Sequence, residues 1–262
     1  MSEEFEKELA KEFVSQTARK TYDDMAHPAA SATGQLVSFI PRTIKVWLGK
    51  WEKWIINGEY SIKETEKLLE KKLANITEDK ITEPAAYVAV PAIQQLSYSL
   101  DSEDLREMYA NLLASSMNID TKANVHPAFV EIIKQLCPDE AKLLKYLSDK
   151  GDQPLIDIHL IQSPKREYSI SLQNFTVIAD GICDNPHKIG FYLDNLARLK
   201  LLDISDDRSL ANDNEYDPLE NHPLIKQIMG TQLPDGKSYE IKKHSFKLTE
   251  FAFDFIKVCL SD

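Results

Sequence analysis

The stretch that decides the fold runs from Leu100 to Leu147 and reads LDSEDLREMYANLLASSMNIDTKANVHPAFVEIIKQLCPDEAKLLKYL. Asp101 or Ser102 can cap a first helix, because a short polar side chain accepts a hydrogen bond from a free N–H of the first turn. The apolar residues that follow recur at three- and four-residue steps, so they share one helix face. Pro127 and Pro138 each begin a further helix, since proline is favoured at the first helical position. The stretch therefore predicts three helices with short connections.

Helical periodicity also dominates the sequence before this stretch. Apolar residues at helical spacing run from Ser31 to Asn57, where Pro41 predicts a kink or a break. Ser61 and Glu64 then match a capping box, which marks the start of another helix. About six helices with short connections predict a packed helical domain over residues 1–150.

Several phrases of this region carry a family resemblance. LREMYANLLASSMN, HPAFVEIIKQL and PDEAKLL occur in this order and close together, and EPAAYVAVPAIQQLSYS precedes them. Together they resemble the Abi-alpha abortive-infection family of bacterial proteins over roughly residues 25–150. The resemblance implies a role in defence against phage, and it brings no catalytic residue set with it.

The sequence changes character after Gly151, because β-branched residues begin to alternate with polar ones. It predicts two strands, at 154–162 and 168–172, and then a short helix at 175–183. A helix at 186–200 capped by Asn185, a strand at 201–205 and a short helix at 222–229 follow. A strand pair within 238–248 and a closing helix at 249–260 complete the prediction. A helix before a β-ribbon and a closing helix are typical of winged-helix modules. We therefore expect a mainly α protein, with a helical domain followed by a winged-helix-like α+β domain at 151–262.

The charge of the chain disfavours a phosphate-binding surface. Its 31 lysines and arginines are outnumbered by 42 aspartates and glutamates, which gives a formal net charge of −11 at pH 7. Duplex binding needs a concentrated positive field, so nucleic acid is the less favoured partner. No run approaches the roughly 18 apolar residues of a membrane span, and the acidic N-terminus is unlike a signal peptide. We expect a cytoplasmic protein with no integral membrane segment.

Common motifs of catalysis, phosphate binding and metal binding are missing from the sequence. The six histidines never fall at the i, i+4 spacing that lets one helix face hold a metal, and no glycine-rich phosphate loop occurs. The three cysteines lie far apart without a C-x-x-C pair, so they are expected to be reduced thiols. We therefore expect no metal, no cofactor and no catalytic residues, while an enzyme whose site is assembled from distant residues stays open as a third reading.

One polar site candidate lies on the most family-like helix. Arg106 and Asn111 stand on its polar side, little more than one turn apart. The alternative is a solvated helix face with ordinary i, i+3 ion pairing.

A second candidate site would make the chain a DNA-binding transcriptional regulator. The polar side chains that could reach phosphates and base edges from the predicted helix and wing are His187, Lys188, Asn195, Arg198, Lys242 and Lys243. Asp184 and Asp194 lie beside and on the predicted helix and would repel phosphate. Protein–protein contact is therefore the favoured reading, with a host or phage protein as the partner, and a homo-oligomer is left open.

Trp47, Trp51 and Trp54 form an unusual cluster, interleaved with lysines. Such a helix could lie on a membrane surface. Burial is the favoured interpretation for Trp47 and Trp51, because they share the apolar stripe, whereas Trp54 falls off the stripe and is expected to be exposed.

Overall fold

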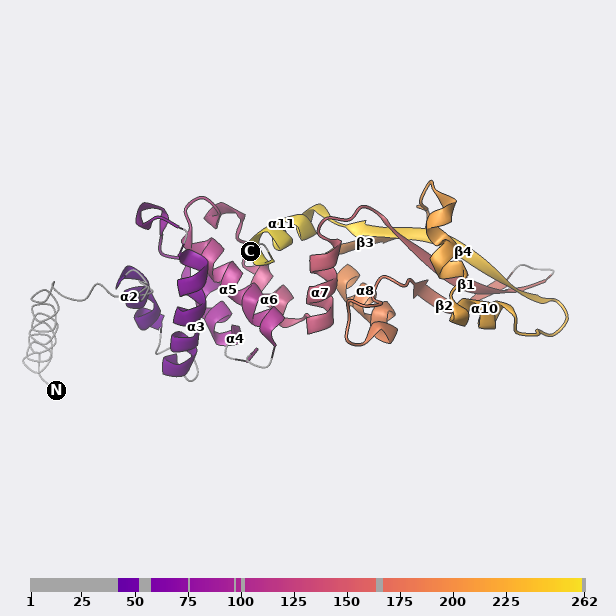
Figure 1. The fold of residues 1–262 in the computed structure, drawn as a ribbon, viewed down its shortest axis with the longest axis horizontal. Helices are drawn as coiled ribbons and strands as arrows, with labels where there is room; N and C mark the ends of the chain where they lie inside the picture. The colour runs from indigo at the N-terminus through magenta and orange to yellow at the C-terminus, as the bar shows by residue number, and fades with distance from the viewer. Residues whose placement is uncertain are drawn as a thin grey trace, which may run out of the picture. The chain divides into compact units, whose positions relative to one another are not determined.

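A set of packed helices is followed in the chain by a sheet with further helices, as the computed structural model shows (Figure 1). The structure describes residues 42–51, 58–74, 76–96, 98–99, 102–163 and 167–260. The chain divides into two units, Met1–Ser38 and Phe39–Asp262, and the described residues all belong to the second. The elements are α2 (Arg42–Trp51), α3 (Gly58–Leu73), α4 (Ala86–Leu96), α5 (Glu103–Met117), α6 (Ala128–Lys134), α7 (Pro138–Leu147), β1 (Gln153–Gln162), β2 (Glu167–Phe175), α8 (Ile189–Arg198), β3 (Leu202–Ser205), α9 (Asp217–Glu220), α10 (Pro223–Met229), β4 (Lys237–Leu248) and α11 (Glu250–Cys259).

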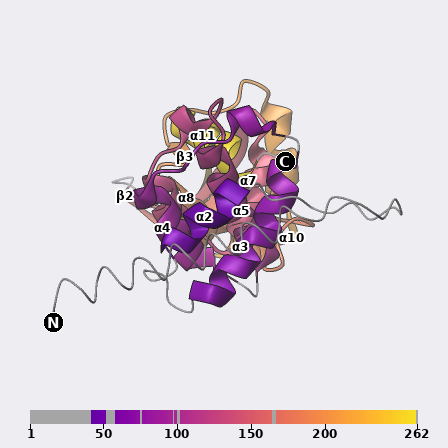
Figure 2. The ribbon, with the colours of Figure 1, turned by 90° about the vertical axis from the view of Figure 1, so that its left-hand side faces the viewer.

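Helix α5 occupies the centre of the helical part. It begins at the predicted cap, where the Leu105 amide donates a hydrogen bond to Ser102 Oγ over 3.4 Å. Its apolar face is fully buried, with Met108 and Leu112 at 1% and 0% exposure. Helices α3, α4, α6, α7 and α11 all contact it. In the view of Figure 2, α2, α3 and α4 lie nearest the viewer and the sheet lies behind them.

The starts of α7 and α11 also follow from local chemistry. Pro138 opens α7, and the Cys137 amide donates to Glu140 Oε2 over 2.7 Å, which satisfies one free donor of the first turn. Thr249 caps α11 by accepting a hydrogen bond from the Ala252 amide at 3.0 Å. The predicted helix starts at these positions are confirmed.

Four antiparallel strands form a sheet in the order β2-β1-β4-β3. The expected combination of helices and strands is confirmed, and the fold as a whole is α+β. The predicted strand pair within 238–248 is wrong, because β4 is one continuous strand that pairs with β1 on one side and β3 on the other. The predicted helix at 175–183 is also wrong: this segment forms successive turns, and Gly181 adopts a left-handed φ of +76° that a helix does not continue through.

Two apolar cores hold the described unit together. The larger core lies among the helices and includes residues from α8 and α11. The ring centroids of Phe129 in α6 and Phe255 in α11 lie 5.3 Å apart, so the end of the chain packs against the helical part (Figure 1). The smaller core joins Ile156 and Ile158 of β1 to Tyr216 and Leu219. Buried residues from both sides of residue 150 thus share one core, and a domain boundary there stays a prediction.

The tryptophan cluster is described in part. Trp47 is half-buried against the larger core, and Ile44 and Leu48 of the same helix are fully buried. The Trp51 side chain and all of Trp54 lie outside the described residues.

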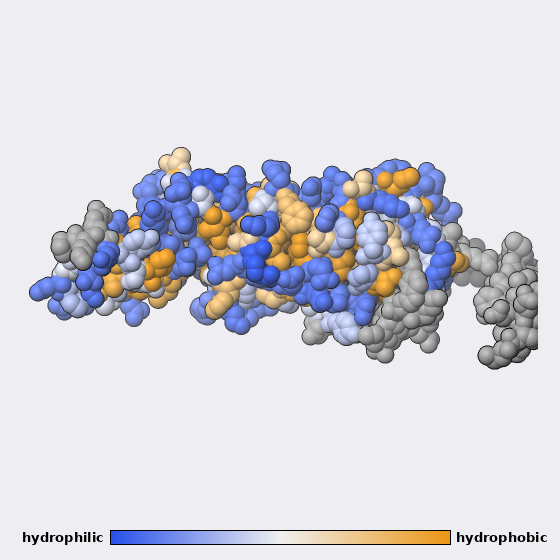
Figure 3. Space-filling view, turned by 180° about the vertical axis from the view of Figure 1, so that it is seen from behind, coloured by the Kyte–Doolittle hydropathy of each residue, from blue (hydrophilic) through white to orange (hydrophobic). Residues whose placement is uncertain are grey.

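On the face drawn in Figure 3, hydrophobic residues interrupt the hydrophilic surface in separate patches. Within the described ranges, no helix has both the length and the apolar character to span a bilayer.

Candidate functional site

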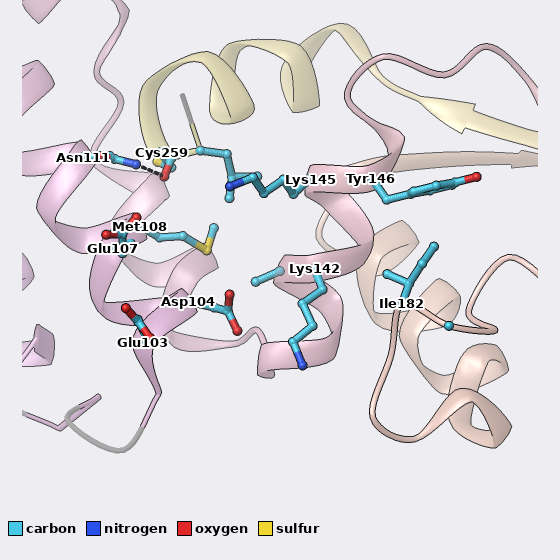
Figure 4. Close-up of a pocket in the computed structure, with 13 residues that line it drawn as sticks. Glu103, Asp104, Glu107, Met108, Asn111, Lys142, Lys145, Tyr146, Ile182 and Cys259 are labelled. Carbon is cyan, nitrogen blue, oxygen red and sulfur yellow. Dashed lines mark hydrogen bonds between the residues drawn. The ribbon is translucent and has the colours of Figure 1, made fainter. Parts of the chain in front are cut away.

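A cavity of about 630 Å³ opens beside α5, between α7, the turn at Gly181 and the end of α11 (Figure 4). Elements that are far apart in sequence therefore meet around it. Its lining residues are Glu103, Asp104, Glu107, Met108, Asn111, Ala141, Lys142, Lys145, Tyr146, Gly181, Ile182, Cys259 and Leu260.

The α5 wall of the cavity is acidic at its outer end. Glu103, Asp104 and Glu107 share one helix face with Met108 and Asn111 because they are spaced by three or four residues. Carboxylates in a first helical turn are stabilised by the helix dipole. Glu107 is partly neutralised, because its Oε2 accepts from Lys72 Nζ at 3.4 Å.

The α7 wall is basic. Lys142 Nζ donates to Asp184 Oδ2 over 2.8 Å and lies 3.7 Å from Asp139 Oδ1. The hydrogen bond to Asp184, together with the charges of both carboxylates, raises the pKa of Lys142 and keeps it protonated. Figure 4 shows Lys142 and Lys145 projecting from α7, with Asp104 on the facing side. The cavity therefore has carboxylates on its α5 wall and lysines on its α7 wall, where the charge of Lys142 is balanced locally by Asp184 and Asp139.

Asn111 lies at the inner end of the cavity and is 7% exposed. Its Nδ2 donates to the Cys259 carbonyl over 3.1 Å, and Ser115 Oγ donates to the Val258 carbonyl over 3.2 Å. These bonds satisfy carbonyls of the last turn of α11, which have no partner within a helix. Asn111 therefore fixes α11 onto α5. Cys259 is fully buried, and burial raises the pKa of its thiol well above the ordinary value, which makes it a poor nucleophile.

Arg106, the other predicted member of the polar site, does not line the cavity. It lies five positions from Asn111, which turns the two side chains about 140° apart around the helix. Its Nε is buried without a hydrogen-bond partner. The structure thus brings Asn111 to the cavity and leaves Arg106 on another side of α5.

The predicted nucleic-acid contacts on α8 and on the turn directly before it fall into two groups. His187 and Lys188 are exposed. Asn195 is held against the helical part, because its Nδ2 donates to Glu140 Oε1 over 2.8 Å and to the Gln135 carbonyl over 3.0 Å.

Arg198 is fixed in the same way. Its Nη2 donates to Asn195 Oδ1 over 2.6 Å, and its Nη1 donates to Gln135 Oε1 over 3.0 Å. Asn195 and Arg198 therefore join α8 to the end of α6 and to α7, and a nucleic acid would compete with these bonds.

The two predicted lysines on β4, Lys242 and Lys243, differ in their surroundings. Lys242 is exposed, whereas Lys243 Nζ lies 2.7 Å from Asp213 Oδ1 and 2.6 Å from Glu220 Oε1. Hydrogen bonds to these two carboxylates raise the pKa of Lys243 and neutralise its charge locally. Three of the six predicted contacts, His187, Lys188 and Lys242, have no ion-pair or side-chain hydrogen-bond partner within the described ranges.

Sequence reasoning missed a buried pair in the sheet. His244 is 1% exposed, and its Nε2 lies 3.1 Å from Asp157 Oδ1, which also accepts from the Asn174 amide at 2.7 Å. Burial opposes ionisation, yet hydrogen bonds from His244 and Asn174 outweigh it and lower the pKa of Asp157. An aspartate inside an apolar strand was the available signal, because a buried carboxylate needs a partner. In the described part of the chain, no cluster of three or more His, Cys, Asp or Glu side chains could hold a metal ion.

Comparison with known proteins gives a family match that reaches beyond the phrases around α5. A family model described as Abortive infection alpha matches residues 57–259, which include the sheet and α11. A solved structure of an uncharacterized protein from the hydrocarbon-degrading marine bacterium Alcanivorax borkumensis SK2 is 17% identical. The alignment covers 51% of this chain and 92% of that one, with a TM-score of 0.34. A search of curated proteins returned no match.

Proposed function

Because the match spans residues 57–259, the chain belongs to the abortive infection alpha family, and we propose that it is an anti-phage defence protein that acts by binding. The family itself suggests the defence role. The cavity beside α5 supports binding, since it lies within the matched residues and its facing walls carry carboxylates and lysines. Cys259, the cysteine among the lining residues, is fully buried, so its thiol is not an accessible nucleophile, which favours recognition over nucleophilic catalysis.

Plaque assays on cells that carry the chain test this proposal. Asp104→Lys reverses an exposed charge of the cavity wall, and Ile182→Trp fills part of the cavity. Both variants should lose restriction of phages that the wild type restricts. Asp254→Lys is the matched control, because Asp254 is exposed on α11 and does not line the cavity. Full protection by both cavity variants would contradict the proposal, as would a failure of the wild type to restrict any phage of a broad panel.

We further propose a winged-helix-like arrangement for the C-terminal part, acting in the cytoplasm. The strand order β1-β4-β3, with α8 directly before β3, supports it. The free thiols of Cys137, Cys183 and Cys259 fit a reducing compartment. This arrangement supports a DNA-binding regulator as the second candidate. The DNA-binding regulator is the weaker candidate, because Arg198 is hydrogen-bonded to Gln135 and Lys243 is ion-paired with Asp213.

A further inference from the structure

A second hollow, of about 410 Å³, lies at the N-terminal half of α8, and its lining residue Asp180 directly precedes Gly181 of the cavity beside α5. The end of β2 and the turn after it form one wall, and the start of α10 forms another. Phe175, Phe191 and Leu224 contribute apolar surface, and Asp180 and Asp194 contribute carboxylates. We call these five residues, with the hollow they line, the α8 groove.

Phe191 is the most exposed large apolar side chain of the groove, at 76%. The other large apolar side chains of α8 face the larger core, and Leu193 and Leu196 are 0% exposed. Phe191 lies off that buried face, so packing of the helix does not require it. Leu224 across the groove is 41% exposed as well. Adjacent exposed apolar side chains around a hollow mark interaction sites more often than isolated ones do.

Asp180 and Asp194 supply the carboxylates of the groove, whose hollow is also lined by His187 and His222. Asp180 and Asp194 are both exposed. Asp194 Oδ1 accepts from Asn174 Nδ2 at 3.4 Å, and no side-chain partner of Asp180 lies within the described ranges. Two carboxylates next to an exposed aromatic ring would repel a phosphate backbone and attract a cation.

The wall formed by β2 is held in place before any partner arrives. Asn174 is 8% exposed and adopts a left-handed φ of +54°. Its amide donates to Asp157, which is paired with His244, so the buried pair in the sheet fixes the end of β2. A preformed wall reduces the ordering entropy that binding would otherwise have to overcome.

We propose that the α8 groove docks a segment of a protein partner that carries an apolar side chain next to an arginine or lysine. The apolar side chain packs between Phe191 and Leu224. The basic side chain pairs with Asp180 and Asp194, and an arginine would also stack on the Phe191 ring. The groove thus gives the chain a protein-binding surface that shares no lining residue with the cavity beside α5.

Selection of short random peptides displayed on phage particles against the full-length chain tests the proposal. Enriched peptides should combine an aromatic or aliphatic residue with a neighbouring arginine or lysine. A synthetic copy of one such peptide, measured by fluorescence polarisation, should bind about tenfold or more weakly to Phe191→Ala and to Asp194→Lys. Phe253→Ala is the matched control, because Phe253 is 43% exposed on α11, and it should bind as the wild type does.

Three outcomes would overturn the proposal. The first is a selection that enriches no peptide, or only acidic ones. The second is peptide binding that Phe191→Ala leaves unchanged while circular dichroism shows every variant folded. The third is tight binding of a duplex DNA that Lys188→Glu abolishes, which would make this face a nucleic-acid surface. None of these results depends on phage restriction, so the proposed defence role is tested separately.

Discussion

Removing the carboxylate of Asp139 should loosen the connection between α7 and α8. Asp139 is 5% exposed and accepts three hydrogen bonds, from the Asp184 amide at 2.8 Å, the Asn185 amide at 2.9 Å and Tyr192 Oη at 2.8 Å. Asp139→Ala leaves these donors without their acceptor. Breaking a buried, charged hydrogen-bond group lowers the free energy of unfolding by about 3–5 kcal/mol. Urea unfolding followed by circular dichroism at neutral pH measures this loss.

The pH dependence separates this electrostatic effect from a simple packing defect. Burial opposes the ionisation of Asp139, but the hydrogen bonds from Asp184, Tyr192 and Asn185, together with Lys142, outweigh it and lower its pKa. A carboxylate with a lowered folded pKa stabilises the fold fully above its unfolded pKa of about 3.9, and this stabilisation is lost as the pH falls through the folded pKa. The difference between wild type and Asp139→Ala should therefore shrink only at pH below about 4. Equal urea midpoints at neutral pH, or a difference that does not shrink in acid, would refute this reasoning.

Three further predictions follow from burial and charge. Leu112→Asp places a carboxylate at a fully buried position of α5, so unfolding should become easier by several kcal/mol and phage restriction should be lost; unchanged restriction would show that α5 is not packed as described. Asn111→Ala should destabilise the chain by about 1–3 kcal/mol in thermal unfolding, because the Cys259 carbonyl loses its donor, and an unchanged melting temperature would show that this bond does not hold α11. In a filter-binding assay at about 150 mM salt, no duplex should be retained more tightly than roughly micromolar, whereas a nanomolar complex lost in Lys242→Glu would favour the regulator.

Much of the helical part was predictable from the sequence because its signals are local. A helix is bonded within itself, so a capping serine at Ser102, prolines at helix starts and an apolar stripe of period 3.6 specify it over a few turns. The strands β1 and β3 were predictable from a similarly local signal, because β-branched and apolar residues alternate with polar ones in their sequences. The structure nevertheless buries four consecutive residues of β1, 155–158, so burial does not follow that alternation. The phrases around α5 likewise sufficed to indicate the family.

The sites were decided by contacts between distant segments. The sequence of residues 237–248 does not predict that β4 pairs with β1 and β3. The backbone N–H and C=O groups of a strand can form hydrogen bonds with any neighbouring strand. The cavity is lined by Asn111 and Cys259, which lie 148 positions apart and share a hydrogen bond, and the α8 groove is lined by α8, the end of β2 and the start of α10. Likewise, the sequence suggested that Arg198 and Lys243 are free cations, whereas in the structure they donate hydrogen bonds to Gln135 and Asp213. Local periodicity determines which elements form, whereas packing of buried apolar faces and pairing of buried polar groups determine which side chains remain available for function.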